Sequence, residues 1–374
     1  MRILILSDIH ANDTALSAVL EHAERTYDIA FNTVLDQEVV ASDRIIFLGD
    51  MLGYGPDAVD VLKKAEKFNA FVVGNHDVFY LELINLLENL GEQTILTNNH
   101  EEVAISQILT DILDELRKGD STLTWDSIKN LSGIAEYVKE TGHLSVNNDF
   151  GFEAMLRNIV QIKAQDYDED WYFKDIKLEK IPEPKSVKLN GYHFILVHGS
   201  LADSIGSGGY IYPGDDFLIQ HSQIEEVKRK YRDSSICLCS GHSHIPLFVS
   251  VDDRQFDMNE IDTYKMVYEE PMKLGKWLTL INPGSVGFPR DCDPRAAYAL
   301  LDTEKKEVTF WRVKYDIDST ISRMNSLHFH KELQEWLRTA EFPKTLNDVC
   351  KRKLANRIKD NKIERGSSHG ISTS

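Results

Sequence analysis

The chain of 374 residues contains little cysteine, an excess of acidic over basic residues and no long apolar runs. Its four cysteines, at positions 237, 239, 292 and 350, do not make a disulfide framework in a chain of this length. Lysine and arginine total 42 against 60 aspartates and glutamates, so the formal net charge is -18. Because a surface of this sign repels a polyanion, the charge argues against nonspecific binding of nucleic acid by the whole surface and leaves only a locally positive groove or tail.

No apolar stretch approaches the roughly 18 residues that a membrane helix needs, so we expect no membrane partner. The first candidate functional residues, Asp8 and His10, stand so close to the start of the chain that cleavage of a secretory signal would remove them. We therefore expect a cytoplasmic protein.

An apolar run over residues 1–6 leads directly into Asp8 and His10. A short continuous apolar run of this kind predicts a buried strand. Aspartate and histidine are metal-ligand types, and here they follow the end of the strand two positions apart. The start of the chain therefore predicts a pair of metal-ligand residues at the carboxyl end of a strand.

The same pattern returns four more times, each time as an apolar run that ends in glycine, aspartate, asparagine or histidine. These blocks are Gly49-Asp50, Gly74-Asn75-His76-Asp77, His198-Gly199 and Gly241-His242-Ser243-His244. Open α/β sheets bind ligands at the carboxyl ends of their strands, so residues far apart in the chain can meet there. We expect the five blocks to converge on one rim.

With these five blocks in this order, the chain resembles the calcineurin-like metallophosphoesterases. Residues 48–56 and 281–287 are similar to the small bacterial and archaeal phosphodiesterase branch of that superfamily. The resemblance covers residues 1–80, 190–250 and 278–313. It implies an α/β fold in which a two-sheet β-sandwich is flanked by helices.

A single core over residues 1–315 is predicted, because the presumed ligands span residues 8–244 and cannot be divided between independent halves. A largely helical insertion is expected at 78–185, with helical spacing in 79–90, 101–116 and 148–164. Two interpretations stay open: a cap over the site that selects a substrate or protein partner, or an amphipathic insertion that packs beside the core. A second, polar insertion at 252–276 is expected to be a surface excursion.

A helical C-terminal tail is expected over residues 316–374, with a disordered end from Gly366 onward. Its charge is reversed, since residues 338–365 contain nine basic and four acidic residues. These basic residues can contact the phosphates of a nucleic acid, form a solvated helix face, or strap the tail onto the acidic body.

The resemblance also implies how two divalent metal ions would be held. By it, Asp8, His10 and His244 bind the first ion, Asn75, His198 and His242 bind the second, and Asp50 bridges both. Imidazole together with carboxylate and amide oxygen suits Mn, Fe, Ni or Zn better than Mg or Ca, which prefer oxygen alone. Manganese is the favoured ion.

Two further residues of the third block are given catalytic roles. As in the family, His76 would donate a hydrogen bond or proton to the leaving oxygen instead of binding metal, and Asp77 would orient it. The alternative for His76 is a purely structural role.

Two candidate substrate-binding residues lie outside the ligand blocks. Asn12 either touches substrate or caps the turn that follows it. Arg290 is either a fixed cation near the phosphate or a surface arginine paired with Asp291 or Asp293.

The predicted function is metal-dependent phosphoesterase activity, and the favoured substrate is a small nucleotide-like phosphodiester attacked by a metal-activated hydroxide. Alternatives are a nuclease that uses the basic tail, a phosphomonoesterase or protein phosphatase, and a dinucleoside polyphosphate hydrolase. The alternative that is not an enzyme is an interaction scaffold that keeps the fold without the metal chemistry. The presence of all seven presumed ligands argues against it.

Overall fold

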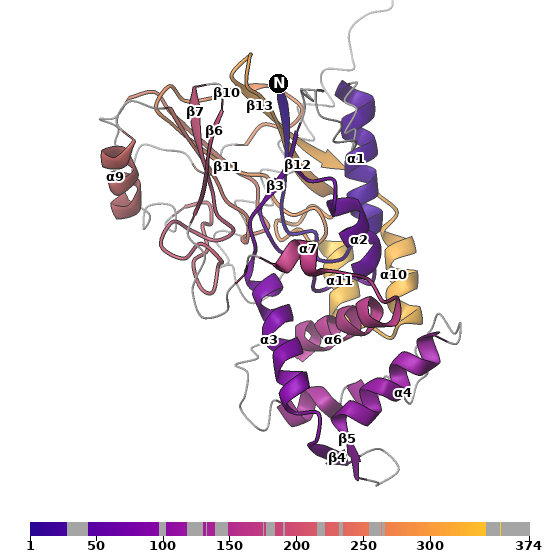
Figure 1. Cartoon of the computed structure of the whole chain (residues 1–374). Helices are drawn as coiled ribbons and strands as arrows, with labels where there is room; N and C mark the ends of the chain where they lie inside the picture. Colours follow the sequence, from indigo (N-terminus) through magenta and orange to yellow (C-terminus); the bar gives the residue numbers. More distant parts are fainter. Residues whose placement is uncertain are drawn as a thin grey trace, which may run out of the picture.

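Two β-sheets form the centre of the molecule, and helices cover them (Figure 1). The structure, a computed structural model, describes residues 1–27, 44–96, 102–117, 130–131, 133–138, 149–174, 176, 184–189, 191–214, 221–231, 235–253, 263, 266–341 and 352. The predicted fold class, an α/β two-sheet sandwich flanked by helices, is confirmed. Among the described helices, none has the length and apolar character required to cross a membrane.

The first sheet has six strands in the order β10-β13-β12-β1-β2-β3. They are β1 (Arg2–Leu6), β2 (Arg44–Phe47), β3 (Ala70–Phe71), β10 (Met272–Lys273), β12 (Ala296–Asp302) and β13 (Glu307–Val313). β1, β2 and β3 are parallel, whereas β12 runs antiparallel to β1. The carboxyl ends of β1, β2 and β3 therefore lie at the same edge.

The second sheet has five strands in the order β6-β7-β8-β11-β9. They are β6 (Lys185–Leu189), β7 (Tyr192–Leu196), β8 (Ser235–Cys239), β9 (Leu247–Val251) and β11 (Leu278–Asn282). β8 is parallel to both β7 and β11, so these three strands also present their carboxyl ends together.

The core lies partly between the sheets and partly under the helices. Alternate residues of β1 divide between the two regions: Ile3 and Ile5 pack with Phe194 of the second sheet, whereas Leu4 and Leu6 pack under Leu16 of helix α1 (Asp13–Tyr27). This division follows from the alternation of side chains along a strand. It also explains why β1 is apolar on both faces.

Most of the insertion lies at the end of the sandwich away from the N-terminus (Figure 1), and its apolar residues belong to the same core as those of β1 and α1. Its elements are α3 (Asn75–Asn89), β4 (Thr94–Leu96), β5 (Glu102–Ala104), α4 (Ile105–Arg117), α6 (Asp149–Ala164) and α7 (Asp170–Phe173). The three expected helices correspond to α3, α4 and α6, but the short β4-β5 hairpin was not predicted. Helix α3 starts four residues earlier than its apolar spacing indicated, so that Asn75 and His76 lie in its first turn.

The expectation of a surface excursion at 252–276 is wrong for its second half. Met266, Tyr268 and Leu274 are buried in the core between the sheets. In addition, β10 pairs with β13 at the edge of the first sheet. The prediction relied on the polar composition of the whole segment and gave too little weight to the apolar residues in its second half.

Helices α2 (Ala58–Ala65), α9 (His221–Lys230), α10 (Ile317–Ser326) and α11 (Lys331–Thr339) complete the described elements. α10 and α11 belong to the predicted C-terminal tail, and its basic segment, residues 338–365, begins in the last turn of α11. Within that segment the structure describes residues 338–341 and 352. The expected disordered end lies outside the described residues.

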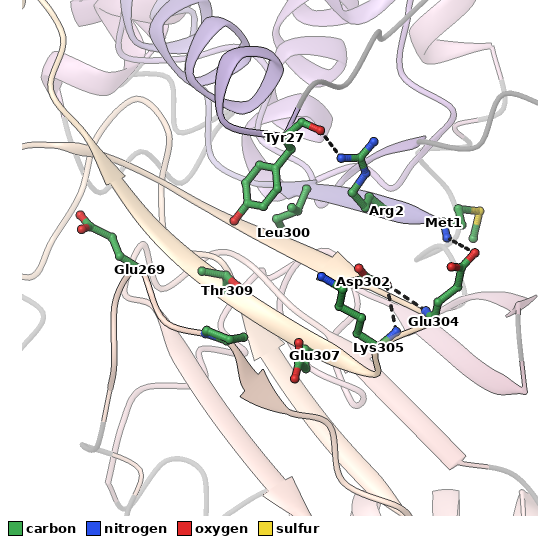
Figure 2. A pocket seen from close by; sticks show the side chains of 11 residues that line it. Met1, Arg2, Tyr27, Glu269, Leu300, Asp302, Glu304, Lys305, Glu307 and Thr309 are labelled. Carbon is green, nitrogen blue, oxygen red and sulfur yellow. Dashed lines mark hydrogen bonds and ion pairs between the residues drawn. The ribbon is translucent and has the colours of Figure 1, made fainter.

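A pocket of about 530 Å³ opens at the amino end of β1, and Figure 2 shows its lining. Acidic and basic groups share this pocket: the amino group of Met1 lies 3.0 Å from Glu304, and Asp302 accepts hydrogen bonds from the backbone of Glu304 and Lys305. These charged groups and backbone nitrogens thus have hydrogen-bond or ion-pair partners within the pocket lining. The pocket also lies at the end of the strand opposite Asp8, so it is separate from the predicted site.

Candidate metal centre

The five sequence blocks lie together at the edge formed by the carboxyl ends of the parallel strands. One ligand atom each from Asp8, His10, Asp50 and His244 lies within 4.8 Å of the others. A second group of this kind comprises Asp50, His198 and His242. Asp50 belongs to both groups, which is the arrangement that a bridging carboxylate requires.

Short distances define the centre of the cluster. His10 Nε2 lies 3.2 Å from His244 Nε2 and 3.5 Å from Asp50 Oδ2. On the other side, His198 Nε2 lies 3.2 Å from the same Asp50 oxygen. The Asp50 carboxylate therefore stands between two imidazole groups that approach it from different sheets.

The backbone at the ligand positions is strained. Positive φ angles occur at Asp8 (53°), His10 (48°), Asp50 (62°), His242 (64°) and His244 (57°). Each such residue costs on the order of 1–3 kcal/mol and persists only where the surroundings enforce it. Five such residues at one site lower the stability of the fold, and their conformation directs these side chains toward the ligand cluster.

Glycines allow the close approach of the blocks. A Cβ on Gly74 would lie 2.0 Å from Asp50 Oδ1, and a Cβ on Gly49 would lie 2.6 Å from the Gly74 nitrogen. Gly49 also has a positive φ of 93°. Any side chain at these two positions would separate the second block from the third.

Backbone carbonyls fix the orientation of three imidazoles. His10 Nδ1 lies 3.1 Å from the Leu52 oxygen and His198 Nδ1 lies 2.6 Å from the Leu48 oxygen, while His244 Nδ1 contacts the oxygen of Phe288. Because a carbonyl can only accept, each Nδ1 carries a proton and each Nε2 faces the cluster. This is the usual way in which proteins orient metal-binding histidines.

Several ligand atoms have no hydrogen-bond partner among the described residues although they are buried. They are Asp8 Oδ1, Asp50 Oδ2, Asn75 Oδ1, His198 Nε2 and His242 Nε2. Buried polar atoms normally find partners, since each unsatisfied one costs about 1–3 kcal/mol. Buried, unpartnered atoms of this kind in and next to the two ligand groups fit divalent cations, and the mixture of oxygen and nitrogen suits transition metals.

Burial sets the protonation of the cluster. It lowers the pKa of His10, His242 and His244 well below the usual range and raises that of Asp8 to about 7. Burial also acts to lower the pKa of His198, but Asp50 and Asp8 outweigh it and raise this pKa to about 9. Three imidazoles are thus held neutral, which is the form that binds metal.

Asp77 does not orient His76, so that prediction is wrong. Its carboxylate instead accepts hydrogen bonds from the backbone of Asp50, Met51 and Gly74, each at 2.9 Å. The backbone nitrogen of His76 donates to Asp50 Oδ1 at 2.9 Å. Asp77 therefore organises the loop that carries Asp50.

The His76 ring lies beside the cluster without joining either ligand group. Its centroid is 4.7 Å from that of His10 and 4.6 Å from that of Tyr54. Its Nδ1 is buried and has no hydrogen-bond partner among the described residues. This nitrogen faces the loop at Gly53 and has no partner there among the described residues.

Asn12 follows the capping alternative. Its Oδ1 accepts from the backbone nitrogen of Ala15 at the start of α1, and its Nδ2 donates to the Gly287 oxygen at 3.0 Å and to the Tyr315 hydroxyl. The side chain is fully buried and its polar atoms are engaged. These contacts leave no role for Asn12 in substrate binding.

Arg290 is buried, contrary to the alternative of a surface ion pair. Asp291 pairs with Arg312, and Asp293 pairs with Arg295. Burial acts to lower the pKa of Arg290, but the neighbouring hydroxyls of Tyr54, Tyr210 and Tyr212 raise it. A buried guanidinium surrounded by aromatic hydroxyls beside the ligand cluster is a fixed positive charge.

Two aromatic residues at the centre were not predicted. The ring of Tyr210 stacks on His242 with centroids 3.9 Å apart, and that of Trp336 stacks on His244 at 5.9 Å. Tyr210 follows a glycine-rich segment, and Trp336 lies on α11 of the tail. Neither position has a sequence pattern that links it to the ligand blocks.

The comparisons with known proteins agree with this geometry. The family model of the calcineurin-like phosphoesterases matches residues 1–246. An uncharacterized protein, MJ0912, from Methanocaldococcus jannaschii is 36% identical over 97 residues. That match covers 26% of this chain and 35% of the relative, so the chain spans about a third of the length of that protein.

Two solved structures share the fold. A metallophosphoesterase from Sphaerobacter thermophilus is 24% identical, with a TM-score of 0.52, over 91% of this chain and 99% of its own. The hypothetical protein PH1004 from Pyrococcus horikoshii is 18% identical, with a TM-score of 0.54, over 91% and 98%. The family model and the buried cluster together show that this chain belongs to the calcineurin-like phosphoesterases, which are metal-dependent hydrolases with a dinuclear divalent metal site.

Proposed function

We propose that this protein is a phosphodiesterase acting on small nucleotide-like diesters. The observation that supports it most directly is the convergence of unsatisfied ligand atoms from both sheets on Asp50. In this proposal Asp8, His10 and His244 hold one ion, Asn75, His198 and His242 hold the other, and Asp50 holds both. When bound, the two ions supply an activated water and neutralise the phosphoryl oxygens.

The remaining residues bind the substrate and move a proton. Arg290 binds a nonbridging phosphoryl oxygen. Its guanidinium is buried, and the neighbouring tyrosine hydroxyls keep it positively charged. His76 donates a hydrogen bond or a proton from its ring to the leaving oxygen, because the ring lies beside both ligand groups without belonging to either. Together they orient the phosphate so that the leaving group faces His76.

Charge and surroundings favour a diester over a monoester. A diester carries one negative charge and a monoester up to two, so the chain's net charge of -18 repels the diester less. Arg290 matches the single charge. The ring of Tyr210, which is next to Arg290 and partly exposed, suits a substituent with a planar apolar part, such as a nucleoside.

Hydrolysis of a chromogenic diester beside the matching monoester tests the proposal. The protein is stripped of metal and refilled separately with Mn, Ni, Zn or Mg. We expect turnover of bis-p-nitrophenyl phosphate to exceed that of p-nitrophenyl phosphate, with Mn favoured, and to vanish in Asp50→Asn. Faster monoester turnover would contradict the diesterase assignment, and no turnover with two bound ions per chain would favour a scaffold.

A further inference from the structure

Helix α6 of the insertion holds the loop that follows Asp50. The side chain of Asn158 accepts a hydrogen bond from the Gly53 nitrogen at 2.8 Å and donates one to the Gly55 oxygen at 3.0 Å. Asn158 is fully buried. A residue from the insertion thus replaces water as the partner of two backbone groups in this loop.

One turn further along α6, Gln161 repeats the contact. It accepts from the Ala58 nitrogen at 3.2 Å and donates to the Pro56 oxygen at 2.8 Å. Residues three apart share one face of a helix, so Asn158 and Gln161 bind the loop side by side. The other side of the loop is fixed by the Gly55 nitrogen, which donates to the His10 oxygen at 2.8 Å.

Helix α7 reaches the same loop through Asp77. The hydroxyl of Tyr172 donates to Asp77 Oδ2 at 2.8 Å, and both side chains are buried. That oxygen also accepts from the backbone nitrogens of Asp50 and Gly74. A chain of hydrogen bonds therefore links the insertion to the backbone of the bridging carboxylate.

The geometry points to a positioning role for the insertion: Asn158 and Tyr172 hold Asp50 and its loop in the conformation that binds metal. Asp50 has a φ of 62°, a conformation that is retained only where surrounding contacts enforce it. The inference rests on the proposed function in taking Asp50 as a metal ligand. It is a role beyond the two interpretations of the insertion given above, since these contacts are made with the loop that follows Asp50.

The variant Tyr172→Phe tests this role, with Tyr80→Phe as the matched control. Tyr80 is a buried tyrosine in the same interface, and its hydroxyl donates to Glu169 at 2.9 Å. It has no hydrogen bond to Asp77 among the described residues. Each variant removes one buried hydroxyl, so the two should lower the melting temperature by similar amounts.

Cobalt(II) binding to metal-stripped protein provides the readout. For Tyr172→Phe we expect the dissociation constant for Co²⁺ to rise about tenfold and the visible absorption of the bound ion to change, as is typical when partners of metal ligands are lost. Tyr80→Phe should bind Co²⁺ like the wild type. Unchanged binding in Tyr172→Phe, or equal changes in the two variants, would overturn the positioning role.

Asn158→Ala extends the test to α6. We expect it to weaken Co²⁺ binding as Tyr172→Phe does, and wild-type binding in a folded Asn158→Ala protein would overturn the role of Asn158. If that variant does not fold, the Tyr172→Phe comparison decides. Wild-type protein that takes up no Co²⁺ would overturn the metal site as well, whereas normal wild-type uptake with unaffected variants would overturn the positioning role alone.

Discussion

The guanidinium of Arg290 lies over the indole ring of Trp336, with Cζ 5.1 Å from the ring centroid. The indole nitrogen donates to the Pro289 oxygen at 2.7 Å, which fixes the ring beneath the arginine. Helix α11 therefore supports the loop that carries Arg290. The predicted C-terminal tail thus contributes to the proposed phosphate site through its first part.

Trp336→Leu should weaken binding of phosphate-containing ligands. A cation–π contact contributes about 0.5–2 kcal/mol, so we expect KM for the diester and the inhibition constant of inorganic phosphate to rise about 3–30-fold while kcat changes less. Steady-state kinetics measure both. Trp311→Leu is the control, because Trp311 packs on α1 and donates to Tyr27. A similar rise of KM in Trp311→Leu would indicate a general effect on folding.

Asp50→Asn should remove more activity than Arg290→Ala. Asp50 belongs to both ligand groups, so its substitution weakens the binding of both ions. In our proposal Arg290 contacts only the substrate. We expect metal analysis to show loss of metal in Asp50→Asn and full occupancy in Arg290→Ala. Equal and mild effects of the two substitutions would contradict the bridging role.

His76→Ala should keep its metal and lose turnover. The ring stands outside both ligand groups, and removal of a proton donor typically lowers kcat by about 10²–10⁴-fold. Metal content and kcat are measured on the same preparation. His22→Ala is the control for loss of a partly buried histidine. His22 contacts the hydroxyl of Tyr298 and belongs to neither ligand group. Metal loss in His76→Ala would show that His76 is a ligand.

Deletion of residues 342–374 should leave diester turnover unchanged. The cut is placed after Glu341 because α11 ends at Thr339 and the Ala340 oxygen accepts from the Cys292 nitrogen at 3.1 Å. The deleted segment carries most of the basic residues of the tail. Cleavage of DNA or RNA that is present in the full chain and lost on deletion would support the nuclease alternative; no change in either activity would exclude it.

Much of the site could be predicted from sequence because each block follows its own strand. An apolar run that ends in Asp, Asn or His indicates a strand and its carboxyl end, and parallel strands bring such ends to one edge. Asp8, Asp50 and His198 were placed together on this basis, and the structure brings His198 Nε2 to 3.2 Å from Asp50 Oδ2 and to 4.0 Å from Asp8 Oδ1. The fold class followed from the same runs.

The sequence alone did not determine which partners the polar residues of the site would have. Asp77 was expected to contact its neighbour His76, but its hydrogen bond to Tyr172 spans 95 positions of the chain. No periodicity connects residues so distant, since the contact depends on how the insertion packs.

Burial was likewise decided by the tertiary structure. Arg290 lies in a sequence rich in charge that suits a surface loop equally well, and Asn158 and Trp336 lie on helices with ordinary amphipathic spacing. The sequence by itself determined which residues end the strands, because strand and turn preferences act over a few residues. The tertiary structure decided which side chains support those residues, because packing and hydrogen bonding between distant segments depend on the whole chain.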